Sequence, residues 1–75
     1  MTTARSAPPD VSIVVPIYNE IDNLPDLVTR IAGAMAGQPL SFELLAVDDG
    51  SNDGSRDKLR ELAESRPWLR PVLLA

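Results

Sequence analysis

Polar and acidic side chains follow each of two apolar runs in this 75-residue chain. Carboxylate, amide and hydroxyl groups in such places can hold a small molecule through hydrogen bonds. If both runs are parallel strands of one sheet, these groups meet at its carboxyl edge, where open α/β sheets bind ligands. The groups are Tyr18-Asn19-Glu20 after the first run and Asp48-Asp49-Gly50-Ser51 after the second.

The first apolar run, Val11 to Ile17, predicts a strand. The run is short, rich in β-branched residues and almost free of polar ones, which is typical of a parallel strand covered on both faces. Pro16 cannot donate a hydrogen bond to a neighbouring strand. We therefore expect strand pairing to stop there and Tyr18 to Glu20 to lie in a loop.

An amphipathic helix is predicted next. Asp22 or Asn23 is placed to cap it, and Pro25 suits its first turn. Gly37 suits the C-cap, so the helix is expected to end near Ala36. The apolar residues of this segment recur at helical spacing and form one stripe: Leu24, Leu27, Val28, Ile31, Ala32 and Met35.

A second strand is predicted from Phe42 to Val47, and a second helix follows the loop after it. Asn52 or Asp53 can cap this helix, and Pro67 ends it. A third apolar run, Val72 to Ala75, predicts a third strand. The apolar stripe of the second helix is short: Leu59, Leu62 and Ala63.

The alternation β-α-β-α-β with short connections predicts a Rossmann-like α/β fold. Right-handed crossovers give a parallel sheet in the strand order 3-2-1. Two crossovers in the same direction place both helices on one face, yet the strands are apolar on both faces. The other face then has no cover and the first strand has a bare edge. We expect residues 11–75 to be the amino-terminal half of a larger domain, or to be completed by a partner chain.

The composition excludes several classes of function. A net charge of -4, from seven basic and eleven acidic residues, does not suit binding to nucleic acid or anionic lipid. The chain has no cysteine, which excludes a disulfide framework or a thiolate metal site. Residues 1–10 lack the apolar run of a signal peptide and are expected to form a flexible leader. No apolar run is long enough to cross a bilayer.

Two longer motifs contain the polar groups: Val14-Val15-Pro16-Ile17-Tyr18-Asn19-Glu20 and Leu45-Ala46-Val47-Asp48-Asp49-Gly50-Ser51-Asn52-Asp53-Gly54-Ser55. Together they resemble the start of an inverting family 2 glycosyltransferase of the GT-A fold. The branch most resembled is the polyprenyl-phosphate one, which includes dolichyl-phosphate mannose synthases and bacterial undecaprenyl-phosphate sugar transferases. The resemblance runs from about Val11 to Leu74. It implies that residues 11–75 are an incomplete GT-A nucleotide-binding domain. The parent protein would transfer a sugar, with inversion, from a UDP- or GDP-linked donor to a polyprenyl phosphate.

The resemblance also implies which residues bind the nucleotide. The carboxylates of Glu20 and Asp49 can accept a hydrogen bond from the imide N–H of a base or from a ribose hydroxyl, and Tyr18 can lie against a base or ribose. Pro16 is expected to contribute through backbone shape. Asp48 can instead hold the loop, since adjacent residues tend to point different ways. The expected nucleotide-binding set is Pro16, Tyr18, Glu20, Asp48 and Asp49.

No catalytic residue is expected within these 75 residues. In the family a later Asp-x-Asp motif binds a divalent metal, Mg2+ or Mn2+, and a further carboxylate serves as general base. Asp48-Asp49 is not that motif, so the metal ligands, the base and the lipid-phosphate surface are expected outside this chain. The chain alone is expected to be inactive. The parent is expected in the cytoplasm, at the inner face of the membrane through missing carboxyl-terminal segments, because nucleotide sugars are cytoplasmic.

Several polar or aromatic residues have simpler structural interpretations. Asn52, Asp53 and Ser55 are expected to cap a helix rather than to touch a ligand. Asn19 is expected to stabilise its loop through side-chain to backbone hydrogen bonds. Trp68 is expected to pack beneath a helix end rather than to form a carbohydrate platform.

Other families fit less well. A receiver domain of a response regulator carries its acidic pair after the first strand, where this chain has Tyr18-Asn19-Glu20. A dinucleotide-binding dehydrogenase has a glycine-rich turn there, and no glycine occurs between Val11 and Ala32. The remaining alternative is a non-catalytic α/β module that forms a homo-oligomer through its bare sheet edge and face.

Overall fold

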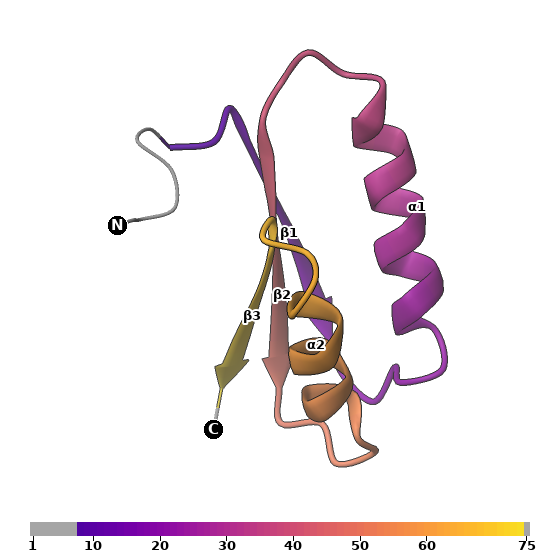
Figure 1. Cartoon of the computed structure of the whole chain (residues 1–75). Helices are drawn as coiled ribbons and strands as arrows, with labels where there is room; N and C mark the ends of the chain where they lie inside the picture. The colour runs from indigo at the N-terminus through magenta and orange to yellow at the C-terminus, as the bar shows by residue number, and fades with distance from the viewer. Residues whose placement is uncertain (1–7, 75) are drawn as a thin grey trace.

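The computed structural model describes residues 8–74. Three strands and two helices alternate along the chain (Figure 1). The predicted first strand and first helix have the expected bounds, while the second and third strands are longer than predicted. The elements are β1 (Val11–Ile17), α1 (Leu24–Ala36), β2 (Phe42–Asp49), α2 (Ser55–Ala63) and β3 (Leu69–Leu74).

The three strands form one parallel sheet in the order β1-β2-β3. This confirms the predicted strand order and the Rossmann-like α/β class, with β2 in the middle. Ile17 of β1 lies opposite Asp48 of β2, and Asp48 lies opposite Leu73 of β3. The carboxyl ends of all three strands therefore meet at one edge of the sheet.

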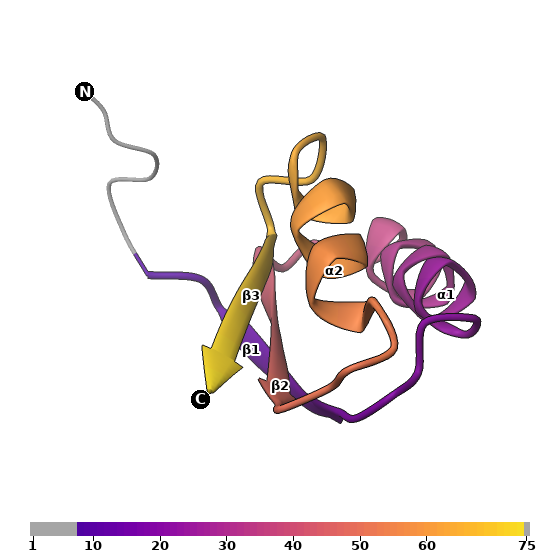
Figure 2. The same ribbon diagram turned by 90° about the horizontal axis from the view of Figure 1, so that it is seen from below.

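Both helices cover the same face of the sheet, as Figure 2 shows. The side chains between them and the sheet form a small apolar core, with Leu24, Leu44 and Leu59 at 1%, 1% and 0% exposure. Burial of such side chains is the main favourable term in folding. The fully buried apolar residues are Ile17, Leu24, Val28, Leu44, Ala46, Leu59 and Leu69.

The opposite face of the sheet carries no helix among residues 8–74 (Figure 2). Strand alternation places Val14 and Val72 on it, and they are 61% and 37% exposed. Its amino-terminal end is polar: Glu43 accepts hydrogen bonds from Ser12 and Arg70. The predicted lack of cover on one face therefore holds for the described residues, and we call this surface the uncovered face.

The third strand begins earlier than predicted. It starts at Leu69 rather than Val72, and the Leu44 N–H donates to the Trp68 carbonyl at 2.8 Å. This start is not evident from the sequence because Arg70 and Pro71 interrupt the apolar run. Pro71 is tolerated because β3 is an edge strand of the described sheet, where one row of N–H groups needs no partner.

The rings of Trp68 and Phe42 lie 5.0 Å apart between centroids. This confirms the packing role expected for Trp68.

The strand β2 is also longer than predicted and runs through Asp49, because Asp48 and Asp49 pair in register with β3.

The N-cap position of α1 is one of the two predicted, whereas that of α2 is not. Asn23 occupies the N-cap of α1, but its side chain makes no capping hydrogen bond. Gly54 occupies the N-cap of α2 with a φ of 97°, a left-handed conformation that favours glycine. Asp53, one of the two predicted caps, nevertheless accepts a hydrogen bond from the first backbone N–H of α2, that of Ser55.

The predicted leader, residues 1–10, lies mostly outside the described residues. Asp10 at its end exchanges hydrogen bonds with Ser41, beside the start of β2. Within residues 8–74, neither helix has the length and apolar character that crossing a membrane requires.

Candidate functional site

Three of the predicted binding residues expose their side chains at the carboxyl edge of the sheet. Tyr18 follows β1 directly and is 61% exposed, and Glu20 lies two residues further along the same loop. Asp49 ends β2 and is also exposed. Since Ile17 and Asp48 are opposite each other in register, the sheet brings the two loops together. Two exposed carboxylates and one aromatic ring are thus presented at one edge, and Glu20 Oε1 also accepts a hydrogen bond from Asn23 Nδ2 at 3.5 Å.

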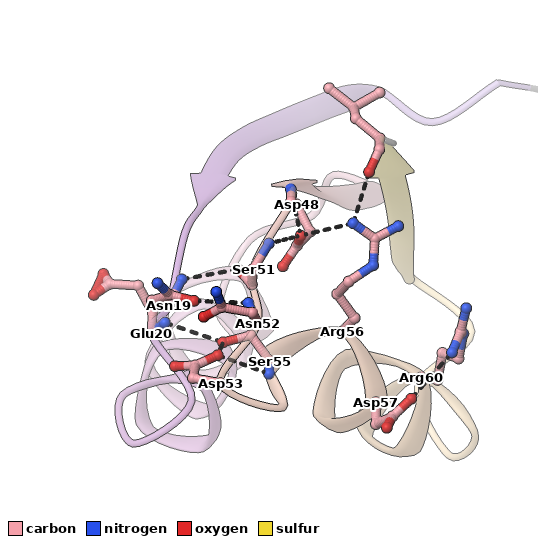
Figure 3. A network of polar contacts seen from close by, with 12 residues as sticks. Asn19, Glu20, Asp48, Ser51, Asn52, Asp53, Ser55, Arg56, Asp57 and Arg60 are labelled. Carbon is pink, nitrogen blue, oxygen red and sulfur yellow. Dashed lines mark hydrogen bonds and ion pairs between the residues drawn. The ribbon is translucent and has the colours of Figure 1, made fainter.

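A set of hydrogen bonds fastens the β1–α1 loop to the β2–α2 loop (Figure 3). Three consecutive backbone N–H groups of the first loop each donate to a side-chain oxygen of the second loop or of Ser55, the first residue of α2, and we call these three bonds the loop clamp. The bonds are Asn19 N–H to Ser51 Oγ at 2.8 Å, Glu20 N–H to Ser55 Oγ at 3.0 Å and Ile21 N–H to Asp53 Oδ2 at 3.2 Å.

Asn19 adds a bond in the reverse direction. Its Oδ1 accepts the backbone N–H of Asn52 at 2.9 Å, and its backbone φ of 50° lies in the left-handed region that asparagine tolerates. The sequence prediction that Asn19 stabilises its loop is confirmed. Its amide oxygen is therefore already used within the protein.

Asp53 joins the loop clamp to the start of α2. Its Oδ1 accepts both the backbone N–H and the hydroxyl of Ser55, and its Oδ2 accepts the N–H of Ile21. The hydrogen bond from the Ser55 hydroxyl, with those from backbone N–H groups, outweighs partial desolvation and holds the pKa of Asp53 below its ordinary value. Asp53 and Ser55 are expected from the sequence to cap the helix, but the N-cap is Gly54, which makes no side-chain capping hydrogen bond; their side chains instead bind the first loop and each other.

Asp48 is fully buried, with 0% exposure. Its Oδ1 accepts the backbone N–H groups of Gly50 and Ser51 at 3.0 and 2.8 Å, so the carboxylate holds the turn that follows β2. Burial alone would raise the pKa of Asp48. Hydrogen bonds from Ser51 and Gly50 and the charge of Arg56 outweigh it, and the pKa lies below its ordinary value.

The place of Asp48 bears on its predicted role. A side chain with no exposed surface cannot touch a nucleotide in this arrangement, and the alternative that Asp48 holds the loop fits the geometry.

Pro16 lies opposite Val47, one residue before the buried Ile17, which places its ring on the uncovered face. Its contribution through backbone shape stays a prediction.

The residues present do not fit a divalent metal. No group of three or more histidine, cysteine, aspartate or glutamate side chains within residues 8–74 is arranged to hold a metal ion. Of the acidic pair, Asp48 has its Oδ1 occupied by N–H donors and paired with the cation of Arg56. A hard cation needs several free oxygen ligands, which this buried carboxylate does not supply.

Arg56 is the residue of this region that the sequence did not single out. Its guanidinium Nη1 donates to Asp48 Oδ1 at 3.2 Å and to the Leu74 carbonyl at 2.6 Å. A signal was available: a cation in the first turn of a helix is electrostatically unfavourable unless an anion is near, and a buried aspartate lies eight residues earlier.

The chain shows clear similarity to known proteins. Residues 12–73 match the family described as Glycosyl transferase family 2. The chain is 47% identical over 55 residues to an undecaprenyl-phosphate 4-deoxy-4-formamido-L-arabinose transferase of Klebsiella pneumoniae, covering 73% of this chain and 17% of the relative. A protein of the same description from Pseudomonas syringae is 48% identical over 65 residues, which are 84% of this chain and 19% of that protein. The chain thus spans less than a fifth of these relatives.

A solved structure supports the same assignment. The mannosyltransferase PcManGT from Pyrobaculum calidifontis, in complex with GDP-Man and Mn2+, superposes with a TM-score of 0.66 at 29% identity. The match covers 92% of this chain and 20% of that one. The parallel sheet, the two helices on one face and the motifs at the carboxyl edge agree with this likeness, and the chain belongs to glycosyl transferase family 2.

Proposed function

We propose that this chain forms the nucleoside-binding part of a longer transferase, which moves a sugar with inversion from a nucleoside diphosphate donor to a polyprenyl phosphate. The observation that carries the proposal is that some polar side chains at the carboxyl edge hold the loops while others stay exposed. Asp48, Ser51, Asp53 and Ser55 spend their polar groups on holding the loops. Tyr18, Glu20 and Asp49 remain exposed there.

The exposed groups match the chemistry of a nucleoside. Uracil and guanine each carry an imide N–H, and ribose carries hydroxyl donors, which the carboxylates of Asp49 and Glu20 accept. The ring of Tyr18 offers a flat apolar surface for the base or the ribose. Because the loop clamp fixes Glu20 relative to β2, these acceptors are positioned before the nucleotide arrives, which lowers the entropic cost of binding.

The chemical step lies beyond the described residues in this proposal. A divalent cation, Mg2+ or Mn2+, supplies charge neutralisation for the leaving diphosphate in such transfers. The described residues do not fit that ion, so its ligands and the general base that activates the acceptor are assigned to other parts of the protein. What this chain does is bind the nucleoside end of the donor and orient it.

The names of the relatives support the class of donor and of acceptor. Both sequence relatives described above are undecaprenyl-phosphate transferases, and the structural neighbour holds GDP-Man. We therefore assign a UDP- or GDP-linked sugar as donor and a lipid phosphate as acceptor. Nucleotide sugars are cytoplasmic, so the domain is assigned to the cytoplasmic face of the membrane.

Isothermal titration of the full-length protein with UDP and GDP, each with and without Mn2+, tests the proposal. One of the two nucleotides should bind, and Asp49→Asn should weaken that binding about tenfold because it replaces a charged acceptor of the imide N–H. Asp57→Asn is the matched control, since Asp57 is 88% exposed on α2 and pairs with Arg60. Equal affinity of the wild type and Asp49→Asn would refute the site, and no binding of either nucleotide would refute the function.

A second function is favoured by one observation. Val14 of β1 is 61% exposed on the uncovered face, together with Val72 on β3, the opposite edge strand of the described sheet. Exposed apolar sheet surfaces of this kind tend to bind other protein molecules. The 75-residue chain by itself could accordingly form a homo-oligomer through this face without binding a nucleotide. Light scattering on the 75-residue chain distinguishes this from a monomer.

A further inference from the structure

One guanidinium nitrogen links three elements at the carboxyl edge. Arg56 is the second residue of α2, and its Nη1 lies 3.2 Å from Asp48 Oδ1 of β2 and 2.6 Å from the carbonyl oxygen of Leu74, the last residue of β3. Figure 3 shows the side chain reaching from the helix to both strand ends. The Arg56 side chain is 28% exposed, so these bonds are partly shielded from water.

The carboxylate at the centre of this arrangement depends on its donors. Asp48 is fully buried, and its Oδ1 accepts hydrogen bonds from two backbone N–H groups and from Arg56. Its Oδ2 is buried without a hydrogen-bond partner among residues 8–74. A buried carboxylate with one unsatisfied oxygen is costly unless a cation is close. In the described part of the chain, the ion pair of Asp48 is with Arg56.

We propose that Arg56 is a positioning residue of the nucleotide site and that it acts through Asp48. The inference rests on the proposed function. Asp48 fixes the N–H groups of Gly50 and Ser51, and it directly precedes Asp49, the exposed acceptor. Removal of the guanidinium leaves the buried charge without its cation and with only the hydrogen bonds of Gly50 and Ser51, so the turn that carries Asp49 rearranges. It also releases the end of β3 at Leu74.

The full-length protein with the substitution Arg56→Ala tests this. Its dissociation constant for UDP or GDP, whichever the wild type binds, should rise about tenfold, the loss expected for a hydrogen bond to a charged group. The KM for the donor should rise with it while kcat stays unchanged, because nucleoside contacts act equally in the ground and transition states. Arg56→Lys keeps a positive charge on the side chain and should recover part of the affinity.

Arg60→Ala is the matched control. It removes a guanidinium from the same helix, but Arg60 is 62% exposed and pairs with Asp57 at the surface. Its dissociation constant should equal that of the wild type, because exposed ion pairs of this kind contribute little. An equal loss of affinity in Arg60→Ala and Arg56→Ala would mean that the loss reflects the change in net charge, and it would overturn the inference.

A double-mutant cycle separates action through Asp48 from direct contact with the nucleotide. In the Asp48→Asn background, Arg56→Ala should change the dissociation constant less than twofold, since the charge that Arg56 serves is gone. A full tenfold loss in that background overturns the inference, as does wild-type affinity in Arg56→Ala. If Arg56→Ala does not fold, the same cycle is run with Arg56→Gln. Failure of the wild type to bind either nucleotide identifies an error in the proposed function instead.

Discussion

The backbone N–H of Glu20 donates to the Oγ of Ser55 at 3.0 Å, across 35 residues of sequence. Ser55 is fully buried and is the first residue of α2, whereas Glu20 is exposed in the loop after β1. The start of one helix thus fixes the backbone of an acidic residue that follows a different strand. This bond is the middle member of the loop clamp.

Replacement of Ser55 by alanine should weaken both folding and nucleotide binding. The change removes the acceptor of the Glu20 N–H and a donor to Asp53, so the free energy of unfolding should fall by about 1–3 kcal/mol. Urea unfolding measures this loss, and titration with the nucleotide measures the accompanying fall in affinity. Ser65→Ala, at an exposed position, is the control and should alter neither quantity. Wild-type nucleotide affinity in Ser55→Ala would show that the loop clamp does not organise the site.

Substitution of two glycines by alanine should change the stability of the fold in opposite directions. Gly54 has a φ of 97°, and a Cβ there would lie 2.9 Å from Ile21 Cδ1, so Gly54→Ala should destabilise the fold by about 1–2 kcal/mol. Gly33 lies in α1, where an added Cβ meets nothing within 4 Å. Gly33→Ala should stabilise by about 0.5–1 kcal/mol. Thermal unfolding of both variants checks the pair, and a stabilising Gly54→Ala would contradict the left-handed cap.

The buried and bonded carboxylates predict a pH dependence of stability. The pKa values of Asp48 and Asp53 are lowered in the folded state from an ordinary value of 3.8, so both ionised groups favour folding. Their contribution is complete at pH well above 3.8 and is lost as the pH falls from there through the folded-state pKa values. The free energy of unfolding should therefore decrease on acidification below about pH 4.

Urea unfolding at a series of pH values measures that decrease. Asp48→Asn should flatten the acidic part of the profile, because the substituted amide does not titrate. Asp57→Asn, a change at an 88% exposed side chain, serves as the control and should retain the wild-type profile. An unchanged slope in Asp48→Asn would mean that the pKa of Asp48 is the same in the folded and the unfolded protein, contrary to the expectation.

The uncovered face predicts association of the 75-residue chain in isolation. Its weight-average mass by light scattering should rise with protein concentration. Val14→Glu should suppress the rise, because it places a charge on the exposed apolar surface. Leu40→Glu is the matched control: Leu40 is 46% exposed but lies in the connection before β2. Suppression by both variants would attribute association to general hydrophobicity rather than to this face.

The sequence by itself determined the alternation of elements, the parallel sheet and the place of the polar motifs. Apolar runs and helical spacing are local patterns, and parallel strands with short crossovers leave few topologies, so β1 and α1 were predicted with their observed bounds. The start of β3 escaped because Arg70 and Pro71 interrupt the apolar pattern, and an edge strand tolerates both.

Only the tertiary structure decided what each polar side chain does. Aspartate and serine have the same chemical groups whether they bind a ligand, cap a helix or fasten a loop, so residue type cannot separate Asp48 from Asp49. Burial separates them: Asp48 is enclosed and bonded to Arg56, while Asp49 is exposed. The bonds of Ser51 and Ser55 to the first loop likewise join residues more than 30 positions apart. Such pairings exist only once the strands have brought the two loops together.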